Sequence, residues 1–169
     1  MKSCFIGLGG NFENTLEIME QALLLLSQTE GIFDLIPSRL FRTSPVSDLP
    51  QPPFLNAVAK FDCSLPLLTL FNKLETLEIF LGKKKKEKNA PRLIDIDLLF
   101  YGQETFCNEK IIVPHPFWKR RLFVLAPLAD LVDVIPFDPL INVQEILREF
   151  SNVNQERVSP LSHKLGRPR

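Results

Sequence analysis

Residues 93–101 constrain the fold of this chain more strongly than any other segment. Side chains of a strand alternate between the two faces of a sheet, and one alternate set here is entirely apolar: Ile94, Ile96, Leu98 and Phe100. The other set places two carboxylates, Asp95 and Asp97, on a single face. This pattern predicts a strand with one face buried in a core and two acids together on the opposite face.

The rest of the sequence has the periodicities of further strands and helices. Apolar runs and helical spacing predict strands over residues 3–9, 32–42 and 54–62, and helices over residues 15–28, 66–81, 121–131 and 142–150. Asn14, with Glu17 three residues later, is expected to cap the first helix.

The order of these elements, β-α-β-β-α-β, predicts an α+β fold of the ferredoxin-like type. Such a fold has an antiparallel sheet with helices on one face, and here the C-terminal part adds further helices. The 169 residues are enough for one ordinary domain with a single core. We therefore expect one domain over residues 1–150, followed by a polar tail or linker over residues 151–169.

Charge and cysteine content exclude several classes of protein. Lys and Arg together number 20, as do Asp and Glu, so the formal net charge is zero, which argues against a general polyanion-binding protein. The three cysteines are far apart and form no CxxC motif, which favours reduced thiols and a cytoplasmic location over a disulfide framework. No apolar run approaches the roughly 20 residues of a membrane span, so no membrane association is expected.

Asp95 and Asp97 are candidates for a metal site. They would lie roughly 7 Å apart along one strand face, and such a pair can converge on two magnesium ions that also bind phosphate oxygens. The alternative is a pair of exposed acids on the open face of a half-buried sheet. The preceding residues 82–92 contain five lysines and one arginine against one glutamate, and this segment could close over a triphosphate. Taken alone, it is equally a solvated loop or a nucleic-acid patch.

Two other segments suit a phosphate and a nucleotide. His115 stands between two prolines and is followed by Arg120 and Arg121, whose guanidinium groups can bind phosphate in a bidentate manner. The alternative is a histidine that packs or caps a turn. Glu75 and Glu78 lie three residues apart on a predicted helix and could contact a nucleotide, although such acids more often form the solvent side of a helix.

Phe54 and Asn56 suit a flat heterocycle. They share a face of their predicted strand, so the aromatic ring can stack on a heterocycle while the amide reads its donors and acceptors. The alternative is a core phenylalanine next to an asparagine at a strand edge.

These candidates belong to a longer series of motifs between about residues 5 and 130. The series comprises Gly9-Gly10-Asn11, Arg42-Thr43-Ser44-Pro45, Phe54-Leu55-Asn56, Glu78, Pro91-Arg92 with Asp95 and Asp97, Tyr101-Gly102, Val113-Pro114-His115-Pro116, Arg121 and Phe123-Val124-Leu125-Ala126-Pro127-Leu128. In order and spacing it resembles the 6-hydroxymethyl-7,8-dihydropterin pyrophosphokinase family of folate biosynthesis.

The resemblance implies an enzyme that transfers the terminal diphosphate of ATP to the pterin hydroxymethyl group, giving the pterin diphosphate and AMP. ATP would be the co-substrate, and two magnesium ions would bind to Asp95 and Asp97. The catalytic residues it implies are Arg92, Asp95, Asp97 and Arg121. The pterin-binding residues it implies are Thr43, Val46, Phe54, Asn56 and Phe123. The ATP-binding residues it implies are Glu75, Glu78, Lys83, Lys85, Arg92, Leu98, His115 and Arg121.

The chain departs from the family pattern mainly in its basic segment. Lysines stand where arginines are usual, and a lysine provides a point charge without the bidentate fork of arginine. Asn89 replaces an aromatic residue that is sometimes found just before the Pro-Arg motif, and Ala90 replaces a common glycine. Members of this family can be fused to dihydropteroate synthase, so fusion to or association with that enzyme is a further expectation.

A ferredoxin-like nucleic-acid-binding module is the alternative from another class. It shares the β-α-β-β-α-β order, and residues 83–88 could follow a phosphate backbone. The aromatic pattern of RNA-recognition motifs is missing, and the two acids after the lysines would repel a backbone. We therefore expect no nucleic-acid partner.

Overall fold

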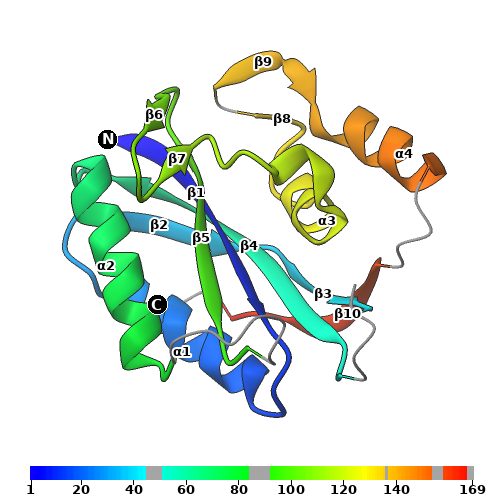
Figure 1. Ribbon diagram of the computed structural model, residues 1–169, viewed down its shortest axis with the longest axis horizontal. Coiled ribbons are helices and arrows are strands. Elements are labelled where there is room, and N and C mark those ends of the chain that lie inside the picture. The colour runs from blue at the N-terminus through cyan, green and yellow to red at the C-terminus, as the bar shows by residue number, and fades with distance from the viewer. Residues whose placement is uncertain (45–50, 84–91, 136, 154–157, 167–169) are drawn as a thin grey trace.

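A six-stranded antiparallel sheet runs through the centre of the molecule (Figure 1). The computed structural model describes residues 1–44, 51–83, 92–135, 137–153 and 158–166. The strands of the sheet are β1 (Lys2–Gly10), β2 (Ile32–Pro37), β3 (Arg39–Thr43), β4 (Phe54–Cys63), β5 (Asp95–Tyr101) and β10 (Val158–Lys164). Their order is β10-β3-β4-β1-β5, and β2 also pairs with β4. β1 therefore lies between β4 and β5.

Different helices cover the two faces of this sheet. The described helices are α1 (Thr15–Ser27), α2 (Leu67–Phe80), α3 (Leu122–Ala129) and α4 (Val143–Val153). Figure 1 shows α1 and α2 at the lower left and α3 with α4 at the upper right. Alternation along β1 explains the division, because Ile6 packs in the cluster of α1 and α2, whereas the adjacent Phe5 packs in the cluster of α3.

Short elements join these parts of the chain. They are a hairpin of β6 (Phe106–Cys107) with β7 (Ile112–Val113), a hairpin of β8 (Val134–Ile135) with β9 (Asp138–Asn142), and a 3-10 helix over Trp118–Arg120. The 3-10 helix leads directly into α3, so its buried Trp118 helps to fix where α3 begins.

The predicted α+β fold with an antiparallel sheet is confirmed, but two strand predictions need correction. The strand expected over residues 32–42 is divided into β2 and β3 at Ser38. There the Ser38 hydroxyl accepts a hydrogen bond from the Val58 N–H at 3.0 Å and donates one to the Arg39 carbonyl at 2.7 Å. The strand expected from residue 93 begins only at Asp95. Its expected alternation also fails at Phe100, because the pairing with β1 shifts register there, and Phe100 packs with Phe5 in the cluster of α3 instead of with Ile96 and Leu98.

Asn14 stands at the N-cap position of α1, as expected, but the side-chain cap expected there is absent. The Asn14 side chain makes no capping hydrogen bond. The Thr15 hydroxyl instead accepts a hydrogen bond from the Phe12 N–H at 2.8 Å, and Thr15 is fully buried. The turn before α1 is therefore held by the first helical residue.

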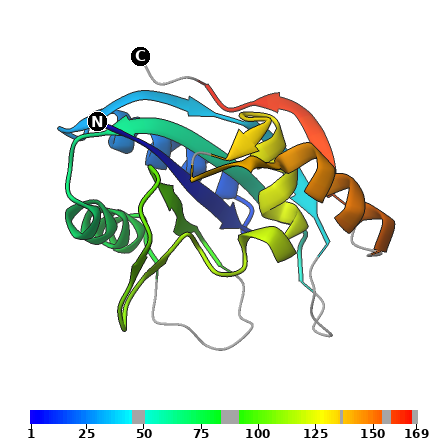
Figure 2. The same ribbon diagram turned by 90° about the horizontal axis from the view of Figure 1, so that it is seen from above.

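Residues 158–164 fall in the segment that the sequence predicts as a polar tail or linker. In the structure they form β10, which pairs with β3 at the outer edge of the sheet, as Figure 2 shows. Leu165 follows and is 5% exposed in the core cluster of α1 and α2. The local sequence does not predict this strand, because the strand with which it pairs lies more than a hundred residues earlier.

The described helices are all too short or too polar to cross a lipid bilayer.

The face that α2 buries provides a test of this fold. Leu70 is fully buried and Leu68, two residues earlier, is 44% exposed. We expect Leu70→Ala to lower the free energy of unfolding by about 2–5 kcal/mol, because it leaves a cavity in the core. Leu68→Ala, the matched control, should change it by only about 0.5 kcal/mol. Urea unfolding measures both, and equal losses would show that the helix buries a different face.

Candidate functional site

A cavity of about 250 Å³ lies over β1, β4 and β5 and collects residues that are far apart in the sequence. Gly7 and Gly9 of β1 line it with backbone alone. Gly9 pairs with Asn56 of β4 on one side and with Asp95 of β5 on the other. The predicted site residues that line the cavity are Thr43, Phe54, Asn56, Arg92, Asp95, Asp97, Arg121 and Phe123.

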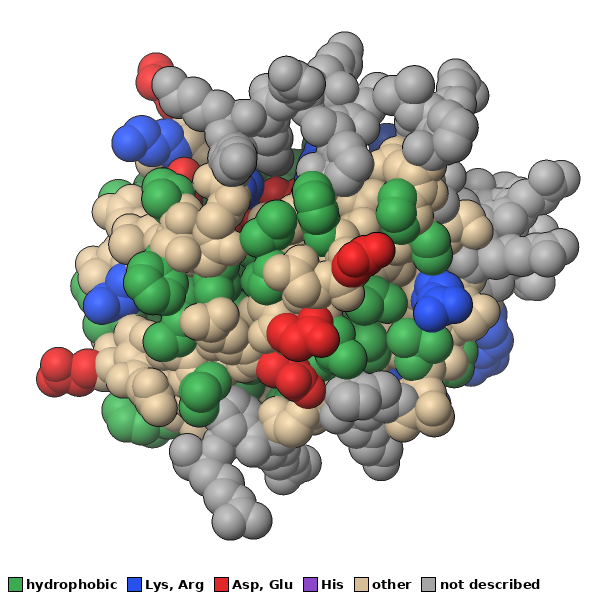
Figure 3. Space-filling view, turned by 90° about the horizontal axis from the view of Figure 1, so that it is seen from below, with side chains coloured by type: hydrophobic (Ala, Val, Ile, Leu, Met, Phe, Trp, Pro, Cys, Tyr) green, Lys and Arg blue, Asp and Glu red, His purple; other side chains and the backbone are tan. Residues whose placement is uncertain are grey.

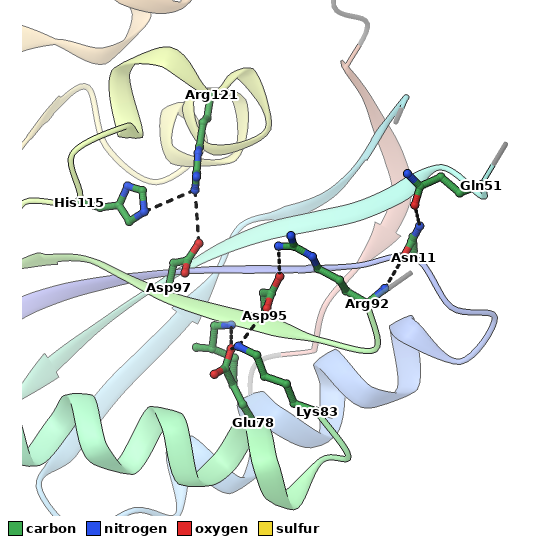
Figure 4. Close-up of polar contacts among 10 residues, drawn as sticks. Asn11, Gln51, Glu78, Lys83, Arg92, Asp95, Asp97, His115 and Arg121 are labelled. Carbon is green, nitrogen blue, oxygen red and sulfur yellow. Dashed lines mark hydrogen bonds and ion pairs between the residues drawn. The ribbon is translucent and has the colours of Figure 1, made fainter. Parts of the chain in front are cut away.

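Asp95 is held between two basic side chains, as Figure 4 shows. Lys83 Nζ lies 3.0 Å from its Oδ1 atom, and Arg92 Nη1 lies 2.6 Å from its Oδ2 atom. Burial of Asp95 by itself would raise the pKa of the carboxyl group, but the hydrogen bonds from Lys83 and Arg92 outweigh burial and hold the pKa below its usual value. Asp95 is therefore an anion in the free protein.

Lys83 also forms an ion pair with Glu78 of α2. The Glu78 side chain is buried, and its Oε1 atom accepts a hydrogen bond from the Ile96 N–H at 2.6 Å. Burial raises the pKa of Glu78, although the hydrogen bonds from Lys83 and Ile96 oppose the rise. Burial would lower the pKa of Lys83, but Glu78 and Asp95 outweigh it and raise that pKa, so Lys83 remains a cation.

Asp97, two residues after Asp95, faces Arg121 at the start of α3. Arg121 Nη1 lies 3.5 Å from Asp97 Oδ2 and 3.4 Å from His115 Nε2. Figure 4 shows the three side chains turned toward one another from β5, from α3 and from the segment before the 3-10 helix. Burial lowers the pKa of His115; the Asp97 carboxylate opposes this change, and the Arg121 cation reinforces it.

The hydrogen bond made by His115 Nδ1 indicates which tautomer the neutral ring adopts. The Phe117 N–H donates to His115 Nδ1 at 3.2 Å, so Nδ1 acts as an acceptor and the proton of the neutral ring is assigned to Nε2. His115 Nε2–H and the Arg121 guanidinium are then two donors close together, and an anion placed between them would accept from both.

The opposite end of the cavity is aromatic and amidic. Phe54 and Asn56 point into it from β4, and Phe123 from α3, with the Arg121 guanidinium 5.6 Å from the Phe123 ring. The buried Asn56 donates from Nδ2 to the Thr43 hydroxyl at 2.9 Å, which fixes the orientation of the amide. The sequence prediction that Phe54 and Asn56 share a face is confirmed, since both line the same cavity.

Asn11 has a structural role that its sequence position does not indicate. This buried side chain donates to Gln51 Oε1 at 3.0 Å and to the Pro52 carbonyl at 3.3 Å, and its own carbonyl oxygen accepts from the Arg92 N–H at 2.7 Å. It therefore joins the backbone near Phe54 to the backbone near Asp95 (Figure 4). A side chain on Gly10 would come within 2.5 Å of the Leu93 carbonyl, so this close approach needs glycine.

Other predicted residues lie beside or outside this cavity. Leu98 and His115 line a second cavity of about 290 Å³, which shares Asp97 with the first. Glu75 is on the exposed side of α2. Glu78 and Lys83 lie beneath the cavity, where both contact the residues of β5. Val46 and Lys85 lie outside the described residues.

The chemistry of Asp95 and Asp97 fits magnesium. Within the described ranges no cluster of three or more His, Cys, Asp or Glu side chains could hold a metal ion. Magnesium needs no such cluster, because it commonly binds through one or two carboxylates and completes its shell with water and substrate phosphates. In the free protein the positive groups of Lys83, Arg92 and Arg121 contact these two acids.

The face of the molecule shown in Figure 3 does not favour the nucleic-acid alternative. Figure 3 views the molecule from below, the side on which α1 lies in Figure 1, and there acidic side chains occupy the centre while Lys and Arg lie at the margins. A nucleic-acid surface would need the opposite arrangement. Among the described residues, Lys83, Arg92 and Arg121 at the cavity are each paired with acids.

Comparison with known proteins gives consistent matches. The model of the 7,8-dihydro-6-hydroxymethylpterin-pyrophosphokinase family matches residues 5–133. A 2-amino-4-hydroxy-6-hydroxymethyldihydropteridine pyrophosphokinase of Haemophilus influenzae is 29% identical over 162 residues, which cover 95% of this chain and 100% of that protein. The Bacillus subtilis protein of the same description is 35% identical over 127 residues, which cover 75% of this chain and 76% of that protein.

Longer proteins also match. A folate synthesis bifunctional protein of Arabidopsis thaliana is 39% identical over 127 residues, and the match covers 75% of this chain but 23% of that protein. A crystal structure of HPPK-DHPS from Plasmodium falciparum, in which HPPK is the abbreviation of the pyrophosphokinase family named above, superposes with a TM-score of 0.69. The aligned residues are 13% identical and cover 89% of this chain and 43% of that chain. This chain thus spans less than half of these two larger proteins, and the likeness to the crystal structure shows the fold alone.

His115 gives the site a measurable dependence on pH. Its pKa is lower in the folded protein than the usual 6.5 of the unfolded chain, so the unfolded state takes up the proton first as the pH falls. We expect the free energy of unfolding to decrease as the pH falls below about 6.5, by about 1.4 kcal/mol for each unit of pKa difference. In the His115→Gln variant this pH-dependent decrease in the free energy of unfolding should be missing. Urea unfolding between about pH 7.5 and 5 measures both proteins, and parallel profiles would contradict the assignment.

Proposed function

The chain belongs to the 7,8-dihydro-6-hydroxymethylpterin-pyrophosphokinase family, which transfers a pyrophosphoryl group to hydroxymethyldihydropterin in folate synthesis, and from this premise we propose that the transfer takes place in the cavity between Phe54, Asp97 and Phe123. The observation that carries this proposal is the division of one cavity into two ends. One end is aromatic and amidic, and the other holds two carboxylates among basic groups.

The aromatic end suits the pterin. Phe54 and Phe123 enter it from β4 and α3, so a flat ring can lie between them. Asn56 uses one amide hydrogen on Thr43, and its Oδ1 atom has no donor among the described contacts, so it can accept a pterin N–H. A side chain at Gly9 would come within 3.0 Å of that Oδ1 atom, so glycine keeps the amide accessible.

ATP would enter from the second cavity, which the apolar Leu98, Ile111 and Phe71 help to line. Because the two cavities share Asp97, a nucleotide base in the second would place its phosphates toward the first. Arg92, His115 and Arg121 would then bind the phosphates, since each has donors close to Asp95 or Asp97. Glu75, Glu78, Lys83 and Lys85 complete the proposed nucleotide site.

Two magnesium ions would be held by Asp95 and Asp97. When bound, they would supply positive charge that neutralises the phosphate oxygens. The residues of the chain bind and orient the substrates around them. Phe54, Asn56 and Phe123 would hold the pterin with the Thr43 backbone beside it, and Arg92 and Arg121 would stabilise the charge that develops on the transferred group. A backbone contact from Val46 belongs to the same proposal.

The pterin hydroxymethyl oxygen attacks the β-phosphorus of ATP. A bond forms between these two atoms, and the bond from the β-phosphorus to the oxygen that bridges to the α-phosphate breaks. AMP leaves with the electron pair of that bond, and the hydroxyl proton is released. The terminal diphosphate is thereby transferred as one unit.

Several wider features belong to the same proposal. We place the core in the ferredoxin-like class and assign the transfer to a single domain. We also propose a cytoplasmic location, since Cys4 and Cys63 are buried free thiols. Relatives of this family include fusions with other folate enzymes, so association with a second enzyme of the pathway is compatible with this chain.

The metal ligands can be tested by removing one charge. Asp97→Asn keeps the side chain's size, and we expect pterin-dependent AMP formation from magnesium and ATP to fall by about a hundredfold or more. The Asp97 side chain is 50% exposed, so stability should change little. Asp62→Asn on β4, outside both cavities, is the matched control. Near-normal turnover in Asp97→Asn would remove this carboxylate from the proposed site.

The pterin end can be tested separately by binding. We expect Phe54→Ala to weaken pterin binding by about 1–3 kcal/mol, because it removes one stacking surface. Titration of pterin fluorescence in the presence of a non-hydrolysable ATP analogue measures this change. The affinity for the analogue itself should stay the same, and Phe33→Ala, at an exposed phenylalanine of β2, controls for a general effect on the fold. Unchanged pterin affinity would place the heterocycle elsewhere.

A further inference from the structure

Six charged residues of the candidate site that the structure describes carry charges that cancel in the free protein. The carboxylates of Glu78, Asp95 and Asp97 are each in contact with a basic side chain, and the basic side chains involved are Lys83, Arg92 and Arg121. A site that binds divalent cations by attraction alone would be expected to hold an excess of negative charge. These six residues have no excess of negative charge.

Asp95 has close contacts with basic groups on both of its carboxylate oxygens. One carboxylate oxygen contacts Lys83 at 3.0 Å and the other contacts Arg92 at 2.6 Å. The Asp95 side chain is only 15% exposed and that of Lys83 only 24% exposed, so water screens the contact weakly. A metal ion at Asp95 would therefore lie next to a positive charge that is already in place.

The backbone fixes where Lys83 stands. It follows Gly82, which ends the unit of α2 with a φ of +96°, and its N–H donates to the Glu78 carbonyl at 2.9 Å. The ammonium group returns to the side chain of the same Glu78. Glu78 is in turn held by the Ile96 N–H. Glu78 thus keeps Lys83 beside Asp95 whether or not the contact with Asp95 is made.

We propose that the Lys83 ammonium group takes the place of a metal ion at Asp95 in the free protein. When the metal binds, Lys83 breaks its contact with Asp95 and keeps its contact with Glu78. The metal is therefore bound well only as a complex with a triphosphate. The triphosphate supplies the anionic oxygens that Arg92 needs once it releases Asp95, while Lys83 keeps its contact with Glu78. The proposal rests on the metal site proposed above at Asp95 and Asp97.

Withdrawal onto Glu78 is favourable because no buried charge is left unpaired. Removing the partner of a buried ion pair is strongly unfavourable, but Lys83 has two partners and gives up only the more exposed one. A lysine suits this role, since its flexible stem and compact charge can shift by a small distance without breaking a bidentate contact. Glu78 would then be a positioning residue, which holds the Lys83 ammonium group by an ion pair and does not itself contact the nucleotide.

The size of the effect follows from Coulomb's law. Two unit charges about 4 Å apart repel in bulk water with an energy equivalent to roughly a fivefold change in a binding constant, and more strongly near a protein surface. A divalent ion doubles this energy. Removing the Lys83 charge should therefore strengthen the binding of a free divalent cation by about tenfold or more.

The test measures the binding of Mn²⁺ to the full chain without nucleotide, from the signal of free Mn²⁺ in electron paramagnetic resonance. We expect weak binding to the unaltered protein and to Lys83→Arg, and binding about tenfold tighter or more to Lys83→Gln. Lys73→Gln, at an exposed position of α2, removes the same charge far from Asp95 and should bind as the unaltered protein does. Equal Mn²⁺ affinity in a folded Lys83→Gln protein would overturn the proposal.

A second variant guards against loss of folding. Lys83→Gln leaves Glu78 buried without its cation, whereas the double variant Glu78→Gln with Lys83→Gln replaces the pair by two amides and keeps the net charge. It should bind free Mn²⁺ more tightly than the unaltered protein, because Lys83 lies closer to Asp95 than Glu78 does, but by less than Lys83→Gln, because the attraction of Glu78 is lost as well. Mn²⁺ affinity equal to that of the unaltered protein would overturn the proposal if the single variant does not fold. With a non-hydrolysable ATP analogue present, the unaltered protein should lower the free Mn²⁺ signal further than the analogue lowers it alone. If it does not, the metal site itself is wrong, which distinguishes that failure from a failure of the role of Lys83.

Discussion

The pairing of β1 with β4 on one side and β5 on the other is the constraint on which the site depends. Gly9 stands between Asn56 and Asp95, so the amide that would read the pterin and the first acid of the phosphate end lie in one row across the sheet. Gly7 stands in the same way between Val58 and Asp97. A shift of one residue in either register would turn these side chains to the other face, and the two ends of the cavity would no longer meet.

Much of this arrangement could be predicted from the sequence, because its basis is local. The two-residue period of a strand placed Asp95 with Asp97 and Phe54 with Asn56, and both pairs line one cavity. What the sequence did not reveal depends on contacts between distant segments. The break at Ser38, the link that Asn11 makes to Gln51 and Arg92, and the ion pairs of Lys83 all require partners that only the folded chain brings together.

The structure also changes the meaning of the acids on α2. Glu75 and Glu78 look alike in the sequence, three residues apart on one helix. In the fold Glu75 is exposed, whereas Glu78 is buried and bonded both to the backbone of β5 and to Lys83. A buried acid that already has two partners would act on a nucleotide at the proposed site only through those partners. The substitution of lysine for arginine in this segment is therefore part of an internal network of charges as well as a change in how phosphate is bound.

β10 has a consequence for how the protein is made. Its residues pair with β3, so that Val158 lies opposite Thr43, beside the proposed pterin site. A ribosome must therefore synthesise nearly all of this chain before that edge of the sheet can close. Until then β3 presents an unpaired edge to its surroundings, and such edges readily pair with other chains. The emerging protein is exposed to misassembly on the side that carries Thr43, and protection by a chaperone would matter most there.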